Sequence, residues 1–268
     1  RALSNRAGVV RTVAERIRAI ADEMGYKPNQ LGRALSMSRN NIKIGVILQG
    51  AETPFMKEVL KGIQEACAEV DNLGGTVLVH KIEHQNAEDV ILAMEKMRME
   101  EVRGIAMVPL DEERVKREID RFVEEFRIPV VTFTSDVEDT KRLCFVGQNG
   151  VQCGRAAAGL MGELTGGKGK VAVISGYSTN TSLSSRVVGF REEIARKYPG
   201  IEIIGPEYCF EENGRAREIT EGIFKDVPDL DGIYLTSHGE EGVCEAIAGA
   251  GKAGQVKMVA NDFYGAEL

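Results

Sequence analysis

The chain has 268 residues, 43% of them hydrophobic and 28% charged, with a formal net charge of −7. Such an apolar fraction can bury a substantial core, which excludes a disordered chain. No apolar run reaches the roughly 18–20 residues that a membrane span needs, and the N-terminal segment is not predicted to be a signal peptide.

Charge is distributed unevenly along the chain. Residues 1–41 carry eight Lys or Arg and three Asp or Glu, a balance of +5, which leaves −12 for the remaining 227 residues. A short basic segment on an acidic body is typical of proteins that contact nucleic acid or an anionic surface. A solvated helix with chance arginines would give the same count, so both interpretations stay open.

The first predicted element is a helix over residues 12–24, where apolar residues recur at three- and four-residue spacing. Thr12 is the expected N-cap, and Glu15 stands three residues later, as in a capping box. Gly25 is expected to end the helix in a left-handed conformation.

A second, shorter helix is predicted over residues 29–35, after the break that Pro28 imposes. Leu31 and Leu35 share one face of it. A helix of this length is marginal in water, so we expect it to form against a partner. Residues 36–41 are predicted to be a polar linker.

From residue 42 onward, nine short β-rich runs alternate with amphipathic helical stretches, which predicts an α/β fold with parallel sheets. Nine strands are many for one sheet, so the expected domains are a partial head with a hinge helix (1–41), an N-terminal lobe (42–149) and a C-terminal lobe (150–268). The expected strands are 42–48, 76–82, 104–110, 129–134, 143–147, 171–175, 201–204, 232–236 and 256–260, and the expected helices are 57–70, 87–99, 112–126, 151–164, 182–197, 215–224 and 240–249.

Polar and aromatic residues follow the ends of these strands, where ligands bind in open parallel sheets. Aromatic faces stack on the C–H faces of a sugar ring, and Arg and Asp make paired hydrogen bonds to neighbouring hydroxyls. The sequence therefore predicts a cleft for a small polar ligand. The residues in question are Phe55, Thr134, Asp136, Arg186, Phe210, Ser237 with His238, and Asp262.

Four of these residues also have purely structural interpretations. Phe55 would be a hydrophobic staple on its helix, and Phe210 would close the core. Arg186 would pair with a surface carboxylate, and Asp262 would cap a following helix. Their shared position at successive strand ends favours the binding site.

Motifs for catalysis, phosphate binding or metal binding are weak. The glycine-rich run 162–169 lacks Ser or Thr after Lys168 and precedes a strand, so it is predicted to be a helix-to-strand turn rather than a phosphate loop. His80 and His84 lie at a strand end without a third ligand, so we expect no metal site. We also expect no cofactor and no enzyme activity, because the sequence shows no nucleophile elbow and no dinucleotide fingerprint. An α/β enzyme would need a base in the cleft, for which His238 is the only well-placed histidine.

Several short motifs in residues 1–35 form one pattern: Arg1-Ala-Leu-Ser-Asn5, Val9, Glu15-Arg16-Ile17, Gly25-Tyr26-Lys27-Pro28-Asn29 and Leu31-x-Arg33-Ala34-Leu35. This pattern resembles the helix-turn-helix head of the LacI/GalR (lactose/galactose repressor) family of transcription regulators, from the middle of the recognition helix through the hinge helix. The remaining chain resembles that family's effector domain, which has the two-lobed, type I fold of ribose-type periplasmic binding proteins. Against that family, we expect the chain to be truncated at both ends.

The resemblance implies roles for particular residues. Near the major groove, Arg1, Ser4 and Asn5 would contact bases or backbone. In the minor groove, Leu35 would wedge between base pairs and bend the DNA. The implied DNA-binding residues are Arg1, Ser4, Asn5, Asn29, Leu31, Arg33 and Leu35, and the implied effector-binding residues are Phe55, Thr134, Asp136, Gln148, Arg186, Phe210, Ser237 and Asp262.

The sequence departs from the family pattern at several positions. Val10 stands where family members often have Ser, and Met56 replaces a second stacking aromatic. Thr134-Ser135 replaces an Asp-Arg pair, with Asp136 as the expected substitute, and Ser237-His238 replaces Asn-Asp. With these changes the prediction of a sugar-like effector stands, and the identity of the effector stays open.

The predicted function is that of a homodimeric transcription repressor that binds operator DNA and is controlled by a sugar or sugar derivative in its interlobe cleft. Closure of the cleft would reposition the hinge helices and so couple the affinity for the effector to the affinity for DNA. Five widely spaced cysteines without a C-x-x-C pattern favour a cytoplasmic location, and no membrane partner is expected. The alternative is a sugar- or solute-binding protein of a transport system with the same fold.

Overall fold

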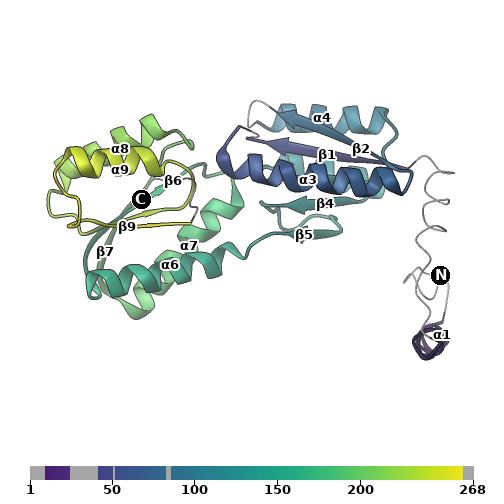
Figure 1. Ribbon diagram of the computed structural model, residues 1–268, viewed down its shortest axis with the longest axis horizontal. Coiled ribbons are helices and arrows are strands. Elements are labelled where there is room, and N and C mark those ends of the chain that lie inside the picture. The colour runs from purple at the N-terminus through teal and green to yellow at the C-terminus, as the bar shows by residue number, and fades with distance from the viewer. Residues whose placement is uncertain (1–9, 25–41, 51, 83–85, 262–268) are drawn as a thin grey trace.

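The computed structural model describes residues 10–24, 42–50, 52–82 and 86–261, which form two parallel sheets flanked by helices (Figure 1). The first lobe is built on a five-stranded sheet. Its elements are β1 (Lys43–Gln49), α3 (Pro54–Asn72), β2 (Thr76–Ile82), α4 (Ala87–Met99), β3 (Ile105–Met107), α5 (Glu113–Glu124), β4 (Val130–Phe133) and β5 (Cys144–Val146).

The second lobe is built on a four-stranded sheet and follows the first in the chain. Residues 147–149, which we call the crossing, lead from β5 into the first helix of the second lobe. The elements of the second lobe are α6 (Gly150–Thr165), β6 (Lys168–Ser175), α7 (Thr181–Lys197), β7 (Gly200–Tyr208), α8 (Asn213–Asp226), β8 (Gly232–Leu235), α9 (Glu240–Gly249) and β9 (Lys257–Ala260).

All the described strand pairs are parallel, in the orders β2-β1-β3-β4-β5 and β7-β6-β8-β9. Strands β1, β6 and β8 lie inside their sheets; β8 is buried throughout, and the last five residues of β1 and of β6 are buried, as expected of strands covered on both faces. Strand β2 lies at an edge and is mostly part-exposed. The predicted two-lobed α/β fold with parallel sheets is confirmed.

The nine predicted strands and the seven predicted helices that follow residue 42 are all present, with some differences in length. Strand β3 covers only three residues, because Pro109 lacks the N–H that would continue the ladder. Strand β7 continues to Tyr208, through an irregularity in its pairing with β6. Helix α3 begins earlier than predicted, because Thr53 caps it and Pro54 starts its first turn.

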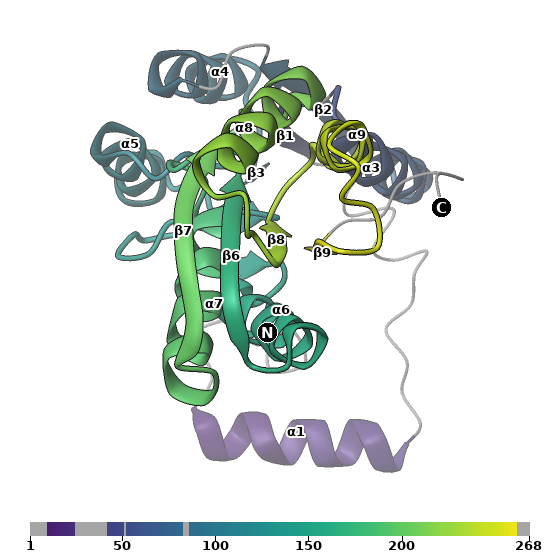
Figure 2. The ribbon, with the colours of Figure 1, turned by 90° about the vertical axis from the view of Figure 1, so that its left-hand side faces the viewer.

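Helix α1 (Arg11–Glu23) lies apart from both sheets (Figure 2). The predicted capping box is wrong: Thr12 lies inside the helix, and Glu15 instead accepts a hydrogen bond of 3.0 Å from Nε of Arg11. The predicted helix end at Gly25 and the predicted helix over 29–35 lie outside the described residues. The large apolar side chains of this helix are exposed in the described structure: Val13, Ile17, Ile20 and, just beyond its end, Met24.

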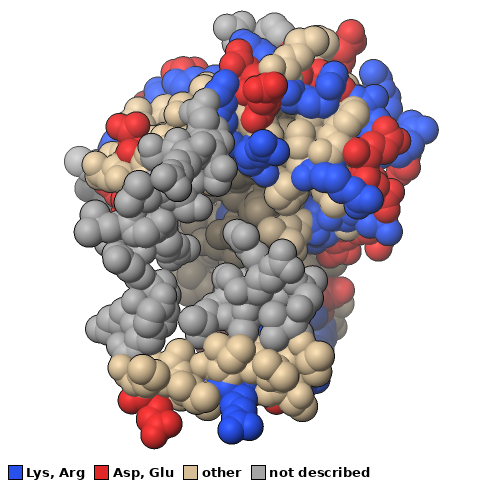
Figure 3. Space-filling model, turned by 90° about the vertical axis from the view of Figure 1, so that its right-hand side faces the viewer, with Lys and Arg blue, Asp and Glu red and all other residues tan. Residues whose placement is uncertain are grey.

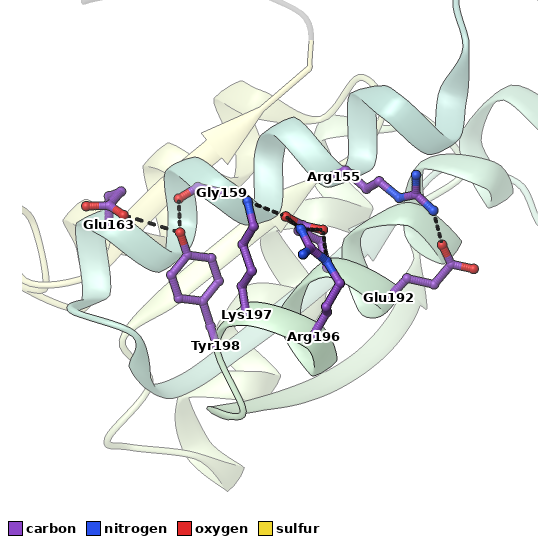
Figure 4. A network of polar contacts seen from close by, with 8 residues as sticks. Arg155, Gly159, Glu163, Glu192, Arg196, Lys197 and Tyr198 are labelled. Carbon is purple, nitrogen blue, oxygen red and sulfur yellow. Dashed lines mark hydrogen bonds and ion pairs between the residues drawn. The ribbon is translucent and has the colours of Figure 1, made fainter.

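Helices α6 and α7 approach each other closely through glycines. A Cβ atom on Gly154 would lie 1.9 Å from the carbonyl oxygen of Arg186, and one on Gly189 would lie 2.0 Å from that of Val151. Polar contacts tie the outer side of the same pair (Figure 4), including a 2.9 Å ion pair between Arg155 and Glu192. Helices α6 and α7 are therefore held as one unit.

The glycine-rich run 162–169 is a helix-to-strand turn, as predicted. Helix α6 ends at Thr165, and Gly166 follows with a φ of 67°, which an L side chain rarely adopts. Strand β6 begins at Lys168. None of the described helices is both long and apolar enough to cross a membrane.

The surface at the end of the first lobe carries charges of both signs (Figure 3). Lys and Arg side chains gather on the upper part of this face, with Asp and Glu between them. The described surface in this view is therefore mixed, whereas the +5 balance of residues 1–41 falls entirely on residues outside the described structure, because residues 10–24 carry three Arg and three Asp or Glu.

Candidate ligand-binding cleft

A cavity of about 230 Å³ lies between the two lobes, at the carboxyl ends of their strands. This is the position at which open parallel sheets bind ligands. Loops and helix N-termini of both lobes, with the crossing between them, form its walls. Its lining includes Gln49, Thr53, Phe55, Met56, Pro109, Leu110, Thr134, Gln148, Asn180, Ser182, Leu183, Arg186, Glu211 and His238.

Phe55 and Met56 form an apolar wall in the first turn of α3. Phe55 is 37% exposed, and Met56 is buried. A hydrophobic staple requires a residue before the N-cap, whereas Phe55 follows the cap residue Thr53, so the staple interpretation is wrong. The exposed ring is available to stack on the C–H face of a ligand.

Arg186 places a buried cation in the cavity wall. It is only 6% exposed. Its Nη1 donates to the carbonyl oxygen of Thr236 at 2.6 Å, and its Nη2 donates to Oε1 of Gln148 at 3.2 Å. These bonds fix the guanidinium between α7, β8 and the crossing. The interpretation as a surface ion pair is therefore wrong.

Gln49 is a cavity residue that the sequence analysis missed. It is 4% exposed, and its Nε2 donates to the carbonyl oxygen of Val108 at 2.6 Å. Its Oε1 is buried and accepts no hydrogen bond from the described part of the chain. A buried acceptor left in this way carries a free-energy cost that a ligand donor can remove. The available signal was an amide at the end of the apolar run of β1.

His238 is held in the cavity wall by a carboxylate. Its Nδ1 lies 2.8 Å from Oε2 of Glu240, and the Gly239 N–H donates to the same oxygen at 3.0 Å. Burial would raise the pKa of Glu240, but these hydrogen bonds outweigh it and leave that pKa lowered. The ionised carboxylate thus fixes the imidazole.

Phe210 and Glu211 have positive φ angles of 56° and 61°, a conformation that is strained for residues other than glycine. Phe210 is 47% exposed and packs on Tyr177, with ring centroids 5.5 Å apart. It does not close the core, and it is not among the cavity lining residues. Glu211 does line the cavity, and sequence reasoning missed it.

The structure brings together Phe55, Thr134, Gln148 and Arg186 of the predicted effector residues. Asp136 instead turns away, accepting a 2.7 Å hydrogen bond from Thr132 Oγ1 and pairing with Arg142 at 2.5 Å. Ser237 is buried, is not among the cavity lining residues, and donates to the carbonyl oxygen of His238 at 3.3 Å. The predicted residues outside the described structure are Asp262 and all seven DNA-binding residues, Arg1, Ser4, Asn5, Asn29, Leu31, Arg33 and Leu35.

Within the described ranges, no group of three or more His, Cys, Asp or Glu side chains is arranged to hold a metal ion. His80 lies on β2, in a separate groove that Lys96 also lines. Burial and the nearby Lys96 lower the pKa of His80. His84 lies outside the described residues.

Comparisons with known proteins place this cleft in context. The family described as periplasmic binding protein domain matches residues 44–268. The D-allose-binding periplasmic protein of Escherichia coli is 24% identical over 227 residues, covering 81% of this chain and 71% of that protein. The HTH-type transcriptional regulator GntR of Pseudomonas aeruginosa is 25% identical over 238 residues, covering 88% of this chain and 65% of the regulator. The crystal structure of a sugar ABC transporter (sugar-binding protein) from Bacillus halodurans has a TM-score of 0.69 at 28% identity, covering 81% of this chain and 74% of that one.

The alignment with the regulator extends beyond the binding domain. Residues 44–268 are 225 of the 268 residues, or about 84% of the chain. An alignment that covers 88% of the chain must therefore include part of residues 1–43.

Proposed function

Because the chain belongs to the periplasmic binding protein domain family, we propose that its cleft binds a sugar or a sugar derivative. The observation that carries this proposal is the pairing of an exposed aromatic wall with buried hydrogen-bonding groups. The ring of Phe55 suits an apolar sugar face, and Arg186, Gln49 and Glu211 offer a cation, a buried acceptor and a carboxylate for hydroxyls.

We propose further that the chain is a DNA-binding regulator, a cytoplasmic repressor that acts as a homodimer and responds to this ligand. The alignment with an HTH-type regulator, which includes part of residues 1–43, supports this role. The +5 balance of residues 1–41 supports it as well, since Lys and Arg neutralise DNA phosphates. In this proposal residues 1–41 contact operator DNA, and the acidic lobes stay off the DNA backbone.

A second candidate is a binding protein of a sugar transport system. The resemblance to the Escherichia coli periplasmic protein and to the Bacillus halodurans sugar-binding protein favours it. Both candidates share the same cleft chemistry. They differ in whether residues 1–41 bind DNA.

A fluorescence-anisotropy titration separates the two candidates. The full-length protein is titrated into a labelled duplex from the DNA upstream of its own coding region. A regulator that contacts six or more phosphates loses about a thousandfold in affinity between 50 and 200 mM salt. Binding without salt dependence, or no binding at either salt concentration, would favour the transport protein.

A thermal-shift panel tests the cleft with D-allose, D-ribose and D-fucose as probes. Arg186→Lys keeps the charge but loses the planar fork that bonds Thr236 and Gln148. We expect the stabilisation by the best sugar to fall strongly in this variant. Arg191→Lys is the matched control, because Arg191 is exposed on the same helix. Equal stabilisation of the wild type and Arg186→Lys would contradict the proposed site.

A further inference from the structure

A cluster of hydrogen bonds joins the two lobes beside the cavity and centres on one hydroxyl. Thr181 is the first residue of α7, in the second lobe, and Ser135 and Asp136 follow β4 in the first. The Thr181 Oγ1 lies 2.9 Å from Ser135 Oγ, accepts from the Asp136 N–H at 3.0 Å and donates to the Asp136 carbonyl oxygen. A hydroxyl has one donor and two acceptor positions, so the first lobe engages all three.

A separate bond joins the same segment to another loop of the first lobe. The Asp111 N–H donates to the carbonyl oxygen of Thr179 at 3.1 Å. Asp111 lies between β3 and α5, and Thr179 lies between β6 and α7. Two loops of the first lobe therefore hold one short segment of the second. We call the bonds of Thr179 and Thr181 to the first lobe the interlobe latch.

The first-lobe side of the latch is braced by contacts within its own lobe. Ser135 is 1% exposed, and its N–H donates to the carbonyl oxygen of Phe133 at 2.7 Å. The Asp136 carboxylate is held by Thr132 and Arg142. Asp136, predicted as an effector contact, thus presents its backbone to the other lobe. Because contacts within the first lobe hold these groups, we expect little conformational entropy to be lost when they bond Thr181.

The second-lobe side of the latch is part of the cavity wall. Asn180 caps α7 by accepting hydrogen bonds from the N–H groups of Ser182 and Leu183. Asn180, Ser182 and Arg186 line the cavity, whereas Thr181 does not. The latch therefore fixes the helix end that carries the cavity residues, without itself reaching the ligand space.

We propose that Thr181 is a positioning residue whose hydroxyl holds the lobes in the closed, binding-competent arrangement. By linkage, whatever stabilises closure raises the affinity for a ligand that contacts both lobes, and bound ligand stabilises the latch by the same factor. The effect on affinity rests on the proposed ligand binding. The effect on closure does not.

Amide hydrogen exchange of the ligand-free protein tests closure directly. Thr181→Val removes the hydroxyl and keeps the shape of the side chain. Its diagnostic readout is the Asp111 N–H, which bonds Thr179 and not Thr181. We expect exchange at Asp111 to become about fivefold faster or more in Thr181→Val, and to stay close to wild type in Thr181→Ser, which keeps the hydroxyl.

Two further variants complete the test. Thr165→Val loses a 2.9 Å hydrogen bond to the Met161 carbonyl oxygen within α6 and should leave exchange at Asp111 unchanged. Ser135→Ala removes one of the three groups that bond the Thr181 hydroxyl and should raise exchange at Asp111 by about twofold. This variant takes the place of Thr181→Val if Thr181→Val does not fold. Unchanged protection of Asp111 in folded Thr181→Val, or in folded Ser135→Ala where that variant serves instead, would overturn the proposal.

Isothermal titration with D-allose then measures the consequence for binding. We expect the Kd to rise about 5- to 30-fold in Thr181→Val, the range for losing one to a few modest hydrogen bonds, and to change less than about threefold in Thr181→Ser. If wild type binds neither D-allose nor the other probes, the proposed ligand class fails, and the exchange data still decide the latch. If D-allose binds Thr181→Val as tightly as Thr181→Ser, while exchange at the Asp111 N–H is faster in Thr181→Val, the latch does not position the site.

Discussion

Gly154→Ala offers a sharp test of how α6 and α7 support the cleft. The new Cβ would lie 1.9 Å from the carbonyl oxygen of Arg186 and 2.7 Å from the backbone nitrogen of Phe190. Comfortable contact for a methyl group is roughly 3.5 Å, so the helices would have to separate by more than about 1 Å. Both clashing atoms belong to the backbone of α7 and cannot rotate away.

The expected magnitude follows from two opposing effects. Overpacking costs about 1–3 kcal/mol, and we expect the upper end because the clash is with backbone. Replacing glycine by alanine inside a helix returns about 1 kcal/mol. The net loss of about 2 kcal/mol should lower the Tm by about 4–8 °C for a chain of this size. Displacing the Arg186 backbone should also weaken the stabilisation that D-allose or another bound sugar provides.

Gly159→Ala is the matched control in the same helix. A Cβ at Gly159 would have no heavy atom within 4 Å apart from its chain neighbours and the backbone of its own helix. The variant should therefore gain about 0.5–1 kcal/mol of stability from helix propensity alone. Thermal unfolding followed by circular dichroism measures both changes. A Gly154→Ala protein as stable as wild type would refute the close approach of α6 and α7, and a destabilised Gly159→Ala would refute the reasoning from open space.

Two other variants probe the cavity wall. Gln49→Met removes the buried acceptor, and we expect sugar affinity in calorimetry to fall about five- to tenfold. The free energy of unfolding should change by less than about 1 kcal/mol, because losing the buried acceptor is stabilising and losing the bond to Val108 is destabilising. Unchanged sugar affinity would show that Gln49 does not contact the ligand. Glu240→Gln should lower stability at pH 7 by about 1 kcal/mol, since the carboxylate is hydrogen-bonded to His238 and Gly239. The pKa of Glu240 is lowered from 4.5, so this stabilisation is present above pH 4.5 and is lost as the pH falls through the lowered value; a difference from wild type that is the same at pH 3 and pH 7 would contradict it.

The fold was largely accessible from the sequence, because the period of apolar residues changes cleanly between strands and helices. Helix α4 was predicted to its exact bounds, since Asn86 caps its start and its apolar face is regular. The length of β7 was missed, because Gly205 and Pro206 suggest a strand end, yet pairing with β6 resumes beyond them. Tertiary pairing decided that boundary, and local propensity did not.

The cleft was accessible only in part. Strand-end position located Phe55, Thr134 and Arg186, but it could not say which way a side chain turns. Asp136 turns back because Thr132 and Arg142 offer it nearer partners. Glu211 lines the cavity because Phe210 and Glu211 adopt left-handed backbone angles, and neither position has the glycine that would predict such a turn from the sequence. Such orientations depend on contacts between elements far apart in the chain.

The helices that begin at the cleft also shape its electrostatics. The first turns of α3 and α7 line the cavity from opposite lobes. Each helix axis carries a dipole equivalent to roughly half a positive charge at its N-terminus. On a chain of net charge −7, the two helix ends and Arg186 therefore add positive potential to a cavity that the Glu211 carboxylate also lines, which suits ligands rich in oxygen lone pairs. The oxygen lone pairs of a ligand are attracted to these two helix ends, which meet where the lobes face each other.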